Sequence, residues 1–145
     1  MKKNYQNKPP AKLFTIGFTR KTAQEFFSIL NRNNVRKLID VRLNNVSQLA
    51  GFTKKQDLEY FLRQISDIDY SHRPDFAPTK DILNDYKKGI ISWQTYSEKY
   101  LNLLRQRQCD KTIEVAEIYS SCLLCSEPKA DKCHRRLLAE YLKAA

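Results

Sequence analysis

Short apolar runs alternate with amphipathic segments along the chain. The run 13–16 is β-prone and stops at Gly17, which predicts a buried strand entering a turn. Thr22 and Glu25 then have the spacing of a capping box, and apolar residues recur at helical spacing from Ala23 to Leu30. A strand followed by a helix is the typical beginning of an α/β fold.

The next apolar run, 35–41, predicts a second strand. Because a helix connects the two strands, we expect the second strand to pair in parallel with the first. Thr53 and Gln56 have capping-box spacing ahead of another helix, whose apolar residues are Leu58, Phe61, Leu62 and Ile65. Asp69 and Tyr70 are expected to return the chain to the sheet.

The second half of the chain continues the pattern. Segment 71–79 contains two prolines and has no apolar period, so a loop is expected there, of a length that often carries function. Helices are predicted over 81–88 and 93–105, a strand over 119–124, and a closing helix over 134–143.

These elements predict one compact α/β domain over residues 13–145, with a mostly parallel sheet flanked by helices in Rossmann-like layers. The length of 145 residues fits a single domain, and 41% hydrophobic with 29% charged residues is typical of a folded protein. Residues 1–12 carry four lysines and two prolines, which indicates a flexible basic arm.

The charge balance is strongly basic. There are 26 Lys and Arg against 16 Asp and Glu, a formal net charge of +10, which favours a nucleic acid or a nucleotide as partner. The basic residues are spread along the whole chain, so charge alone leaves this open. The sequence shows no secretory signal and no stretch that predicts a membrane span, so a cytoplasmic protein with free thiols is expected.

Polar residues collect where the predicted strands end. The first strand ends at Gly17, the second at Asp40-Val41-Arg42 and the last at Cys125-Ser126-Glu127, while Cys133-His134-Arg135 opens the last helix. Ligands of open parallel sheets bind beyond the carboxyl ends of the strands. We therefore expect these groups to face one crevice.

Four of these residues are candidate anion ligands. Arg42 at the end of a buried strand needs a charged partner or a ligand, and Asp40 either orients it or takes part in binding. Arg135 lies at a helix start, where backbone N–H groups and the helix dipole favour anions. Gly17 either lets backbone amides approach an anion or simply forms a turn.

Thiol chemistry is the alternative that the same motifs leave open. Cys133 or Cys125 is a candidate nucleophile or redox thiol, with His134 or Glu127 as proton-transfer partner. Cys133 has more thiolate character at a helix start, whereas a small buried cysteine is the ordinary alternative. A third possibility is a non-catalytic interaction module, in which Glu127 and Arg135 form a structural network.

No metal site and no cofactor are predicted. Cys122, Cys125, Cys133 and His134 lie close enough in sequence to hold zinc, but residues three apart on a strand point to opposite faces, which separates Cys122 from Cys125. A cysteine-phosphatase loop is excluded as well, because Asp131 stands where an arginine would follow Cys125. His72, in the predicted loop, is a weaker candidate than His134.

Several motifs together resemble the bacterial and archaeal family called domain of unknown function 488. They are Thr15-Ile16-Gly17, Asp40-Val41-Arg42, Ser47, Asp69-Tyr70, Leu124-Cys125-x-Glu127 and Cys133-His134-Arg135. The resemblance covers about residues 13–142. It implies a compact α/β domain with a cluster around Arg42, Cys125, Glu127, Cys133, His134 and Arg135, and it supplies no reaction.

The chain departs from this family pattern at two places. Phe18 stands where the family often has histidine or tyrosine, and segment 72–76 replaces a glycine-rich loop. Any role that the family gives to these positions therefore does not transfer. The leading hypothesis is a domain that binds a phosphate-bearing ligand between Arg42 and Arg135.

Overall fold

The computed structural model describes residues 12–44, 51–125 and 133–144. The strands are β1 (Leu13–Gly17), β2 (Lys37–Asp40), β3 (Asp69–His72) and β4 (Ser121–Cys125). The helices are α1 (Ala23–Arg32), α2 (Lys55–Phe61), α3 (Lys80–Lys87), α4 (Trp93–Gln106), α5 (Val115–Ile118) and α6 (His134–Ala144). Short 3₁₀ turns are η2 (Gly51–Thr53), η4 (Pro74–Phe76) and η5 (Cys109–Lys111), and a π-helical turn η3 (Leu62–Ser66) follows α2.

The four strands form one parallel sheet in the order β1-β4-β2-β3. This confirms the predicted α/β fold, but the predicted pairing of the first two strands is wrong. β4 lies between them, with Leu124 beside Ile16 on one side and beside Asp40 on the other. All five residues of β4 are buried, and a strand buried on both faces gains most from a central position.

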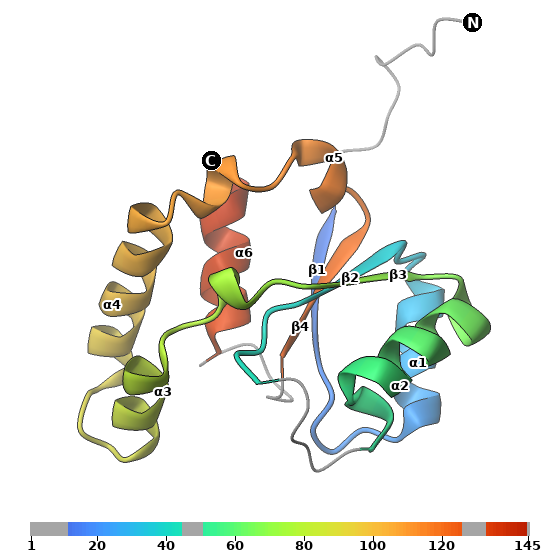
Figure 1. Ribbon diagram of the computed structural model, residues 1–145, viewed down its shortest axis with the longest axis horizontal. Helices are drawn as coiled ribbons and strands as arrows, with labels where there is room; N and C mark the ends of the chain where they lie inside the picture. The colour runs from blue at the N-terminus through green and yellow to red at the C-terminus, as the bar shows by residue number, and fades with distance from the viewer. Residues whose placement is uncertain (1–11, 45–50, 126–132, 145) are drawn as a thin grey trace, which may run out of the picture.

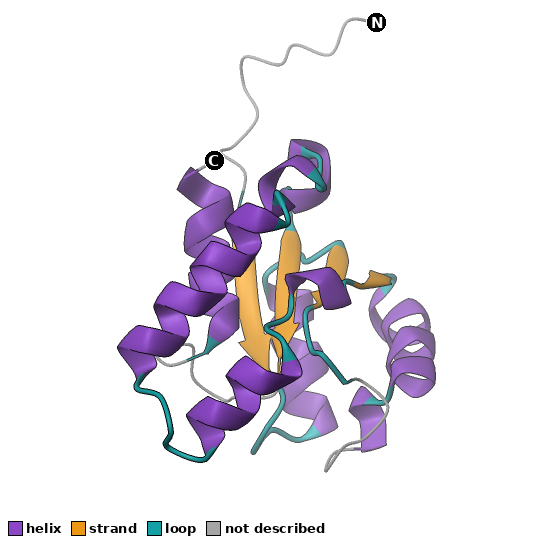
Figure 2. Ribbon diagram, turned by 60° about the vertical axis from the view of Figure 1, so that its left-hand side comes forward, coloured by secondary structure: helices purple, strands orange, loops and turns teal. Residues whose placement is uncertain are grey.

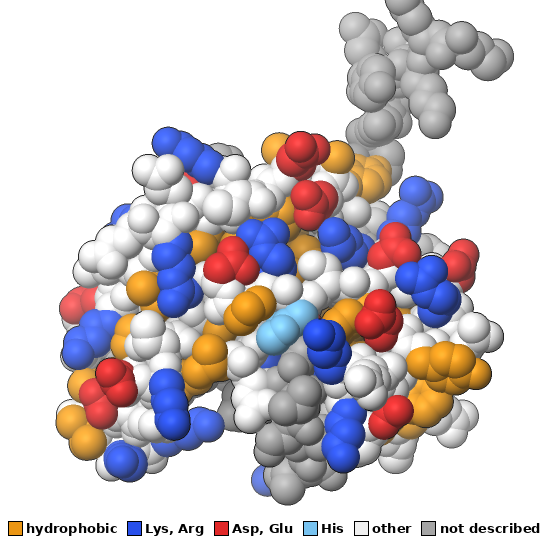
Figure 3. Space-filling view, viewed as in Figure 1, with side chains coloured by type: hydrophobic (Ala, Val, Ile, Leu, Met, Phe, Trp, Pro, Cys, Tyr) orange, Lys and Arg blue, Asp and Glu red, His pale blue; other side chains and the backbone are white. Residues whose placement is uncertain are grey.

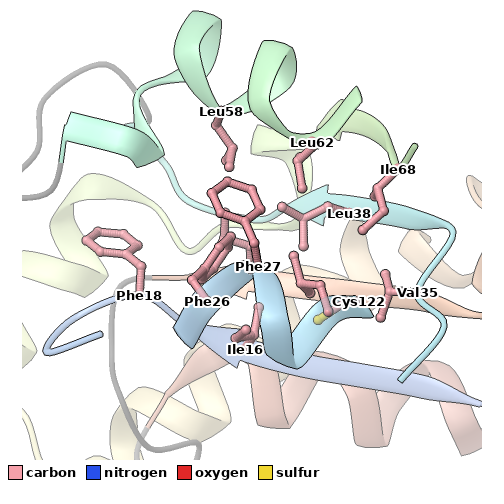
Figure 4. Close-up of a cluster of buried hydrophobic side chains, with 12 residues drawn as sticks. Ile16, Phe18, Phe26, Phe27, Val35, Leu38, Leu58, Leu62, Ile68 and Cys122 are labelled. Carbon is pink, nitrogen blue, oxygen red and sulfur yellow. The ribbon is translucent and has the colours of Figure 1, made fainter. Parts of the chain in front are cut away.

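Helices cover both faces of the sheet (Figures 1 and 2). α1 and α2 lie against one face, where Figure 4 shows phenylalanines of α1 between the strands and two leucines, Leu58 of α2 and Leu62 of η3. This first core contains Ile16, Phe18, Phe26, Phe27, Leu30, Val35, Leu38, Leu58, Leu62, Ile68, Cys122 and Leu124.

The helices α4 and α6 cover the other face. Alternate strand residues supply this second core, so that Ile39 and Leu123 face it while their neighbours Leu38 and Cys122 face the first. Its buried members are Ile39, Val41, Phe76, Tyr100, Leu104, Cys109, Ile113, Leu123, Cys125, Cys133, Leu138 and Leu142. Cys122 and Cys125 therefore lie on opposite faces, as strand geometry predicts.

One of the two threonines predicted to cap a helix does so. Thr22 caps α1, and its side chain accepts a hydrogen bond from the Glu25 amide. The second is wrong, because Lys54 and not Thr53 precedes α2. Thr53 ends the preceding 3₁₀ turn and is fully buried. Ile65 is 54% exposed, since the π-helical turn shifts the apolar period out of register.

The other predicted elements differ from the structure mainly at their ends. β3 continues to His72, so the predicted loop 71–79 begins two residues later than expected and contains the 3₁₀ turn Pro74–Phe76. β4 begins at Ser121, after Ser120 in a left-handed conformation with φ of 59°. Within the described ranges, no helix is long and apolar enough to cross a membrane.

Candidate functional site

The described candidate residues lie at the carboxyl edge of β1, β4 and β2, as the sequence predicts for a parallel sheet. They form two groups, one on each face. The ion pair of Asp40 and Arg42 lies toward α2, and a thiol cluster of Cys125, Cys133 and Arg135 lies toward α6. Glu127, Ser47 and the arm 1–11 are outside the described residues.

The side chains of Asp40 and Arg42 form a buried bidentate ion pair. Arg42 Nε donates to Asp40 Oδ1 over 2.8 Å, and Nη2 donates to Oδ2 over 2.7 Å. The Tyr70 hydroxyl donates to Oδ2 over 2.6 Å, and the Arg42 amide donates to Oδ1 over 3.1 Å. Asp40 therefore accepts four hydrogen bonds and holds Arg42 in one orientation.

The remaining part of the Arg42 guanidinium is directed away from Asp40. Nη2 also donates to the Thr53 carbonyl over 2.7 Å, and the guanidinium carbon lies 5.3 Å from the centre of the Phe18 ring. Nη1 is buried and has no hydrogen-bond partner among the residues that the structure describes. Arg42 is only 4% exposed, so this is a buried charged group with donor capacity left.

The thiol cluster joins the end of β4 to the beginning of α6. The Sγ atoms of Cys125 and Cys133 lie 2.6 Å apart, and both side chains are buried. Arg135 Nη1 lies 3.1 Å from Cys125 Sγ and 3.7 Å from Cys133 Sγ. The pKa of Cys133 is raised, first by its hydrogen bond to Cys125 and then by burial, so Cys133 keeps its proton at neutral pH.

His134 links the two groups through the backbone. Its Nε2 lies 2.9 Å from the Val41 carbonyl, and burial lowers its pKa to about 4. The ring is therefore neutral near pH 7, and since only an N–H can bond a carbonyl, Nε2 carries the proton. His72 makes a similar contact with the carbonyl of Arg42, the residue after Val41, and its Nε2 lies 2.8 Å from that oxygen.

The turn after β1 lies beside both groups. Phe18 contacts Arg42, and Lys21, whose amide donates to the Phe18 carbonyl, has its pKa lowered by burial and by the charge of Arg135. Gly17 remains in β1, paired with Cys125, and the left-handed residue of the turn is Arg20 with φ of 63°. The turn thus does not depend on the conformational freedom of glycine at position 17.

Three potential metal ligands meet in the thiol cluster, although the sequence predicted no metal site. The ligand atoms of Cys125, Cys133 and His134 lie within 4.8 Å of one another. Cys122 and Cys125 lie on opposite faces of β4 as predicted, but the start of α6 returns to the end of β4 and brings Cys133 and His134 to Cys125. Two thiols and an imidazole are ligands that zinc accepts.

Tyr70, Thr53 and Lys21 are site residues that the sequence analysis missed. Tyr70 reaches Asp40 because β3 lies directly beside β2, with Asp40 paired to His72. The contact between Tyr70 and Asp40 could be recognised only once the strand order was known. Thr53 contributes its carbonyl, which no side-chain pattern reveals.

A comparison with protein families matches residues 22–142 to the model described as Domain of unknown function DUF488. The chain belongs to the DUF488 family. The match contains the Asp40–Arg42 pair and the thiol cluster, and it begins after the turn that carries Phe18 and Lys21. No curated protein and no solved structure matches this DUF488 chain.

Proposed function

We propose that this DUF488 domain binds a phosphate-bearing ligand, a nucleic acid or a nucleotide, at the carboxyl edge of β1, β4 and β2. The observation that carries the proposal is Nη1 of Arg42, which is buried without a hydrogen-bond partner among the described residues. A buried donor left unsatisfied costs about 1–3 kcal/mol, and more when it is charged. A phosphate oxygen is the acceptor that a guanidinium fixed in this way binds best.

Further positive charge surrounds the turn after β1. Lys21 lies close enough to Arg135 for the two charges to repel, which contributes to the lowered pKa of Lys21. The first turn of α6 begins here as well, and its backbone N–H groups favour an anion. Asp40 neutralises part of this charge, and its role in the proposal is to orient Arg42.

The lysines and arginines on the rest of the surface attract a polyanion without binding it specifically. On the face shown in Figure 3, lysines and arginines are scattered among acidic side chains and form no single basic patch. The formal net charge of +10 raises the encounter rate with a polyanion, and this effect weakens as salt is added. Specific binding is therefore expected at the sheet edge.

The direct test is fluorescence anisotropy of labelled single- and double-stranded oligonucleotides across a salt series, with ATP as competitor. Arg42→Lys keeps the charge and removes the spare N–H group, and circular dichroism establishes that the variant is folded. We expect salt-dependent binding by the native chain and at least tenfold weaker binding by the folded variant. Equal binding by the two proteins, or no binding by the native chain, would overturn the proposal.

A cytoplasmic location belongs to the same proposal. The four cysteines Cys109, Cys122, Cys125 and Cys133 are buried and are not assigned to a disulfide, which fits a reducing compartment. The alternative of a non-catalytic interaction module predicts instead that substitutions at the sheet edge lower stability and change no ligand binding.

A further inference from the structure

The two sulfurs of the thiol cluster are positioned for reaction with each other. Cys125 is the last residue of β4 and Cys133 directly precedes α6, and their Sγ atoms are 2.6 Å apart. A disulfide bond is about 2.05 Å long, so an approach of about 0.5 Å would close it. This separation is shorter than a non-bonded contact between two sulfurs, so the end of β4 and the start of α6 bring the two side chains together as a pair.

A guanidinium group lies against both sulfurs. Arg135 Nη1 is 3.1 Å from Cys125 Sγ and 3.7 Å from Cys133 Sγ. A cation and a helix start both favour the thiolate, which is the reactive form of cysteine. Since the closer sulfur gains more, Cys125 is assigned as the thiolate and Cys133 as the thiol that donates to it.

The other two cysteines provide a contrast within the same chain. Cys122 packs in the first core, and burial raises its pKa. Cys109 packs in the second core, and burial raises its pKa too. The sulfur of Cys122 lies 3.9 Å from the Leu123 carbonyl, and the sulfur of Cys109 lies 3.7 Å from the Asp75 carbonyl. For both thiols the effect of burial on the pKa outweighs that of the nearby arginines. Both are expected to be unreactive.

The geometry favours a dithiol over a metal site. Two thiolates on a tetrahedral zinc, with Zn–S of about 2.3 Å, have sulfurs about 3.8 Å apart, which is much farther than the 2.6 Å between Cys125 and Cys133. Arg135 also supplies the positive charge that a metal would bring. Cys125 and Cys133 are 2% and 3% exposed, so only small oxidants are expected to reach their sulfurs.

We infer that Cys125 and Cys133 form a redox-active dithiol that a small hydroperoxide oxidises to a disulfide. This activity is separate from the proposed ligand binding and does not require it. The two thiols together give up two electrons to the peroxide O–O bond. An external dithiol, such as dithiothreitol, restores the reduced pair by thiol–disulfide exchange.

The oxidation proceeds in two balanced steps. The Cys125 thiolate attacks the terminal oxygen of the hydroperoxide, an S–O bond forms, the O–O bond breaks, and the alkoxide leaves as an alcohol after taking a proton. The sulfur of Cys133 then attacks the sulfenic acid of Cys125. The S–S bond forms, the S–O bond breaks, and hydroxide leaves as water with the proton of Cys133.

The experiment begins with the reduced full-length chain and one equivalent of hydrogen peroxide. Remaining thiols are blocked with N-ethylmaleimide, and tryptic peptides are analysed by mass spectrometry. We expect a Cys125–Cys133 linkage, loss of two thiols for each peroxide, and oxidation of Cys125 at least tenfold faster than that of Cys122 or Cys109. Dithiothreitol should restore all four thiols.

Matched serine variants separate the two roles. Cys133→Ser should accumulate a sulfenic acid at Cys125 that dimedone traps, Cys125→Ser should form none, and Cys122→Ser should behave as the native chain. Oxidation of all four thiols at equal rates in the native chain would overturn the inference without relying on any variant. Stoichiometric zinc in the purified chain that Cys125→Ser abolishes, with no linkage after peroxide, would overturn it in favour of a metal site.

Discussion

Arg135 Nη1 lies 3.1 Å from the sulfur of Cys125, so a guanidinium from the first turn of α6 contacts the last residue of β4. The contact brings a buried positive charge to a buried thiol. Arg135 therefore has a part in both proposals: it adds positive charge at the carboxyl edge of the sheet, where the ligand is proposed to bind, and it stabilises the proposed thiolate of Cys125.

The charge of Arg135 should control the reactivity of Cys125. Arg135→Gln keeps hydrogen-bonding capacity and removes the charge, and we expect about tenfold slower peroxide oxidation of Cys125 at pH 7, the equivalent of about one pKa unit. Arg136→Gln is the matched control, because Arg136 is exposed and pairs with Glu140. Dimedone labelling rates in the Cys133→Ser background report the reaction. Equal slowing by both variants would show a general charge effect only.

The buried ion pair predicts a large difference between two substitutions at one site. Asp40→Asn removes the charge that balances Arg42 and should lower the free energy of unfolding by about 3–5 kcal/mol. Tyr70→Phe removes only a hydrogen bond to the same carboxylate and should cost about 1–3 kcal/mol. Urea denaturation measures both. A loss under about 1 kcal/mol for Asp40→Asn, typical of an exposed pair, would contradict the buried geometry.

Stability should fall in mild acid because of His134. Its folded pKa of about 4 lies below the ordinary histidine value of 6.5, so the unfolded chain binds the proton more tightly and stability is lost as pH falls from about 6.5 toward 4. Between pH 7 and pH 5 this amounts to about 2 kcal/mol. His134→Gln retains a donor for the Val41 carbonyl and should flatten the profile of urea midpoints in this range. An unchanged slope would mean that His134 is accessible to protons when folded.

The fold was largely predictable because its periodicity is local. Thr22 with Glu25 placed α1, and the apolar spacing placed α4 and α6 within a residue or two. Strand order was not predictable in this way, since the burial of β4 between β1 and β2 depends on contacts far apart in sequence. Thr53 failed as a cap because its carbonyl is engaged by Arg42, a tertiary contact that outweighs local preference.

The position of the candidate site at the edge of the sheet was predictable from the sequence, whereas the contacts between its side chains were less so. Parallel strands end at one edge, which correctly placed Arg42, Cys125 and Arg135 there. Residue alternation along β4 separated Cys122 from Cys125, yet the contact between Cys125 and Cys133 depends on where α6 begins. Such a contact has no periodic signal in the sequence.

Ligand binding at the sheet edge is tested most directly by comparing two lysines of equal charge. Lys21 lies on the turn beside Arg135, whereas Lys143 is exposed at the opposite end of α6. Both Lys→Gln variants lower the net charge by one, so non-specific attraction changes equally. The measurement is the oligonucleotide dissociation constant across a salt series, which yields the number of phosphates neutralised.

We expect weaker binding and a salt slope smaller by about 1 for Lys21→Gln, with Lys143→Gln close to the native chain. Identical affinities and slopes for the two variants would contradict binding at this edge.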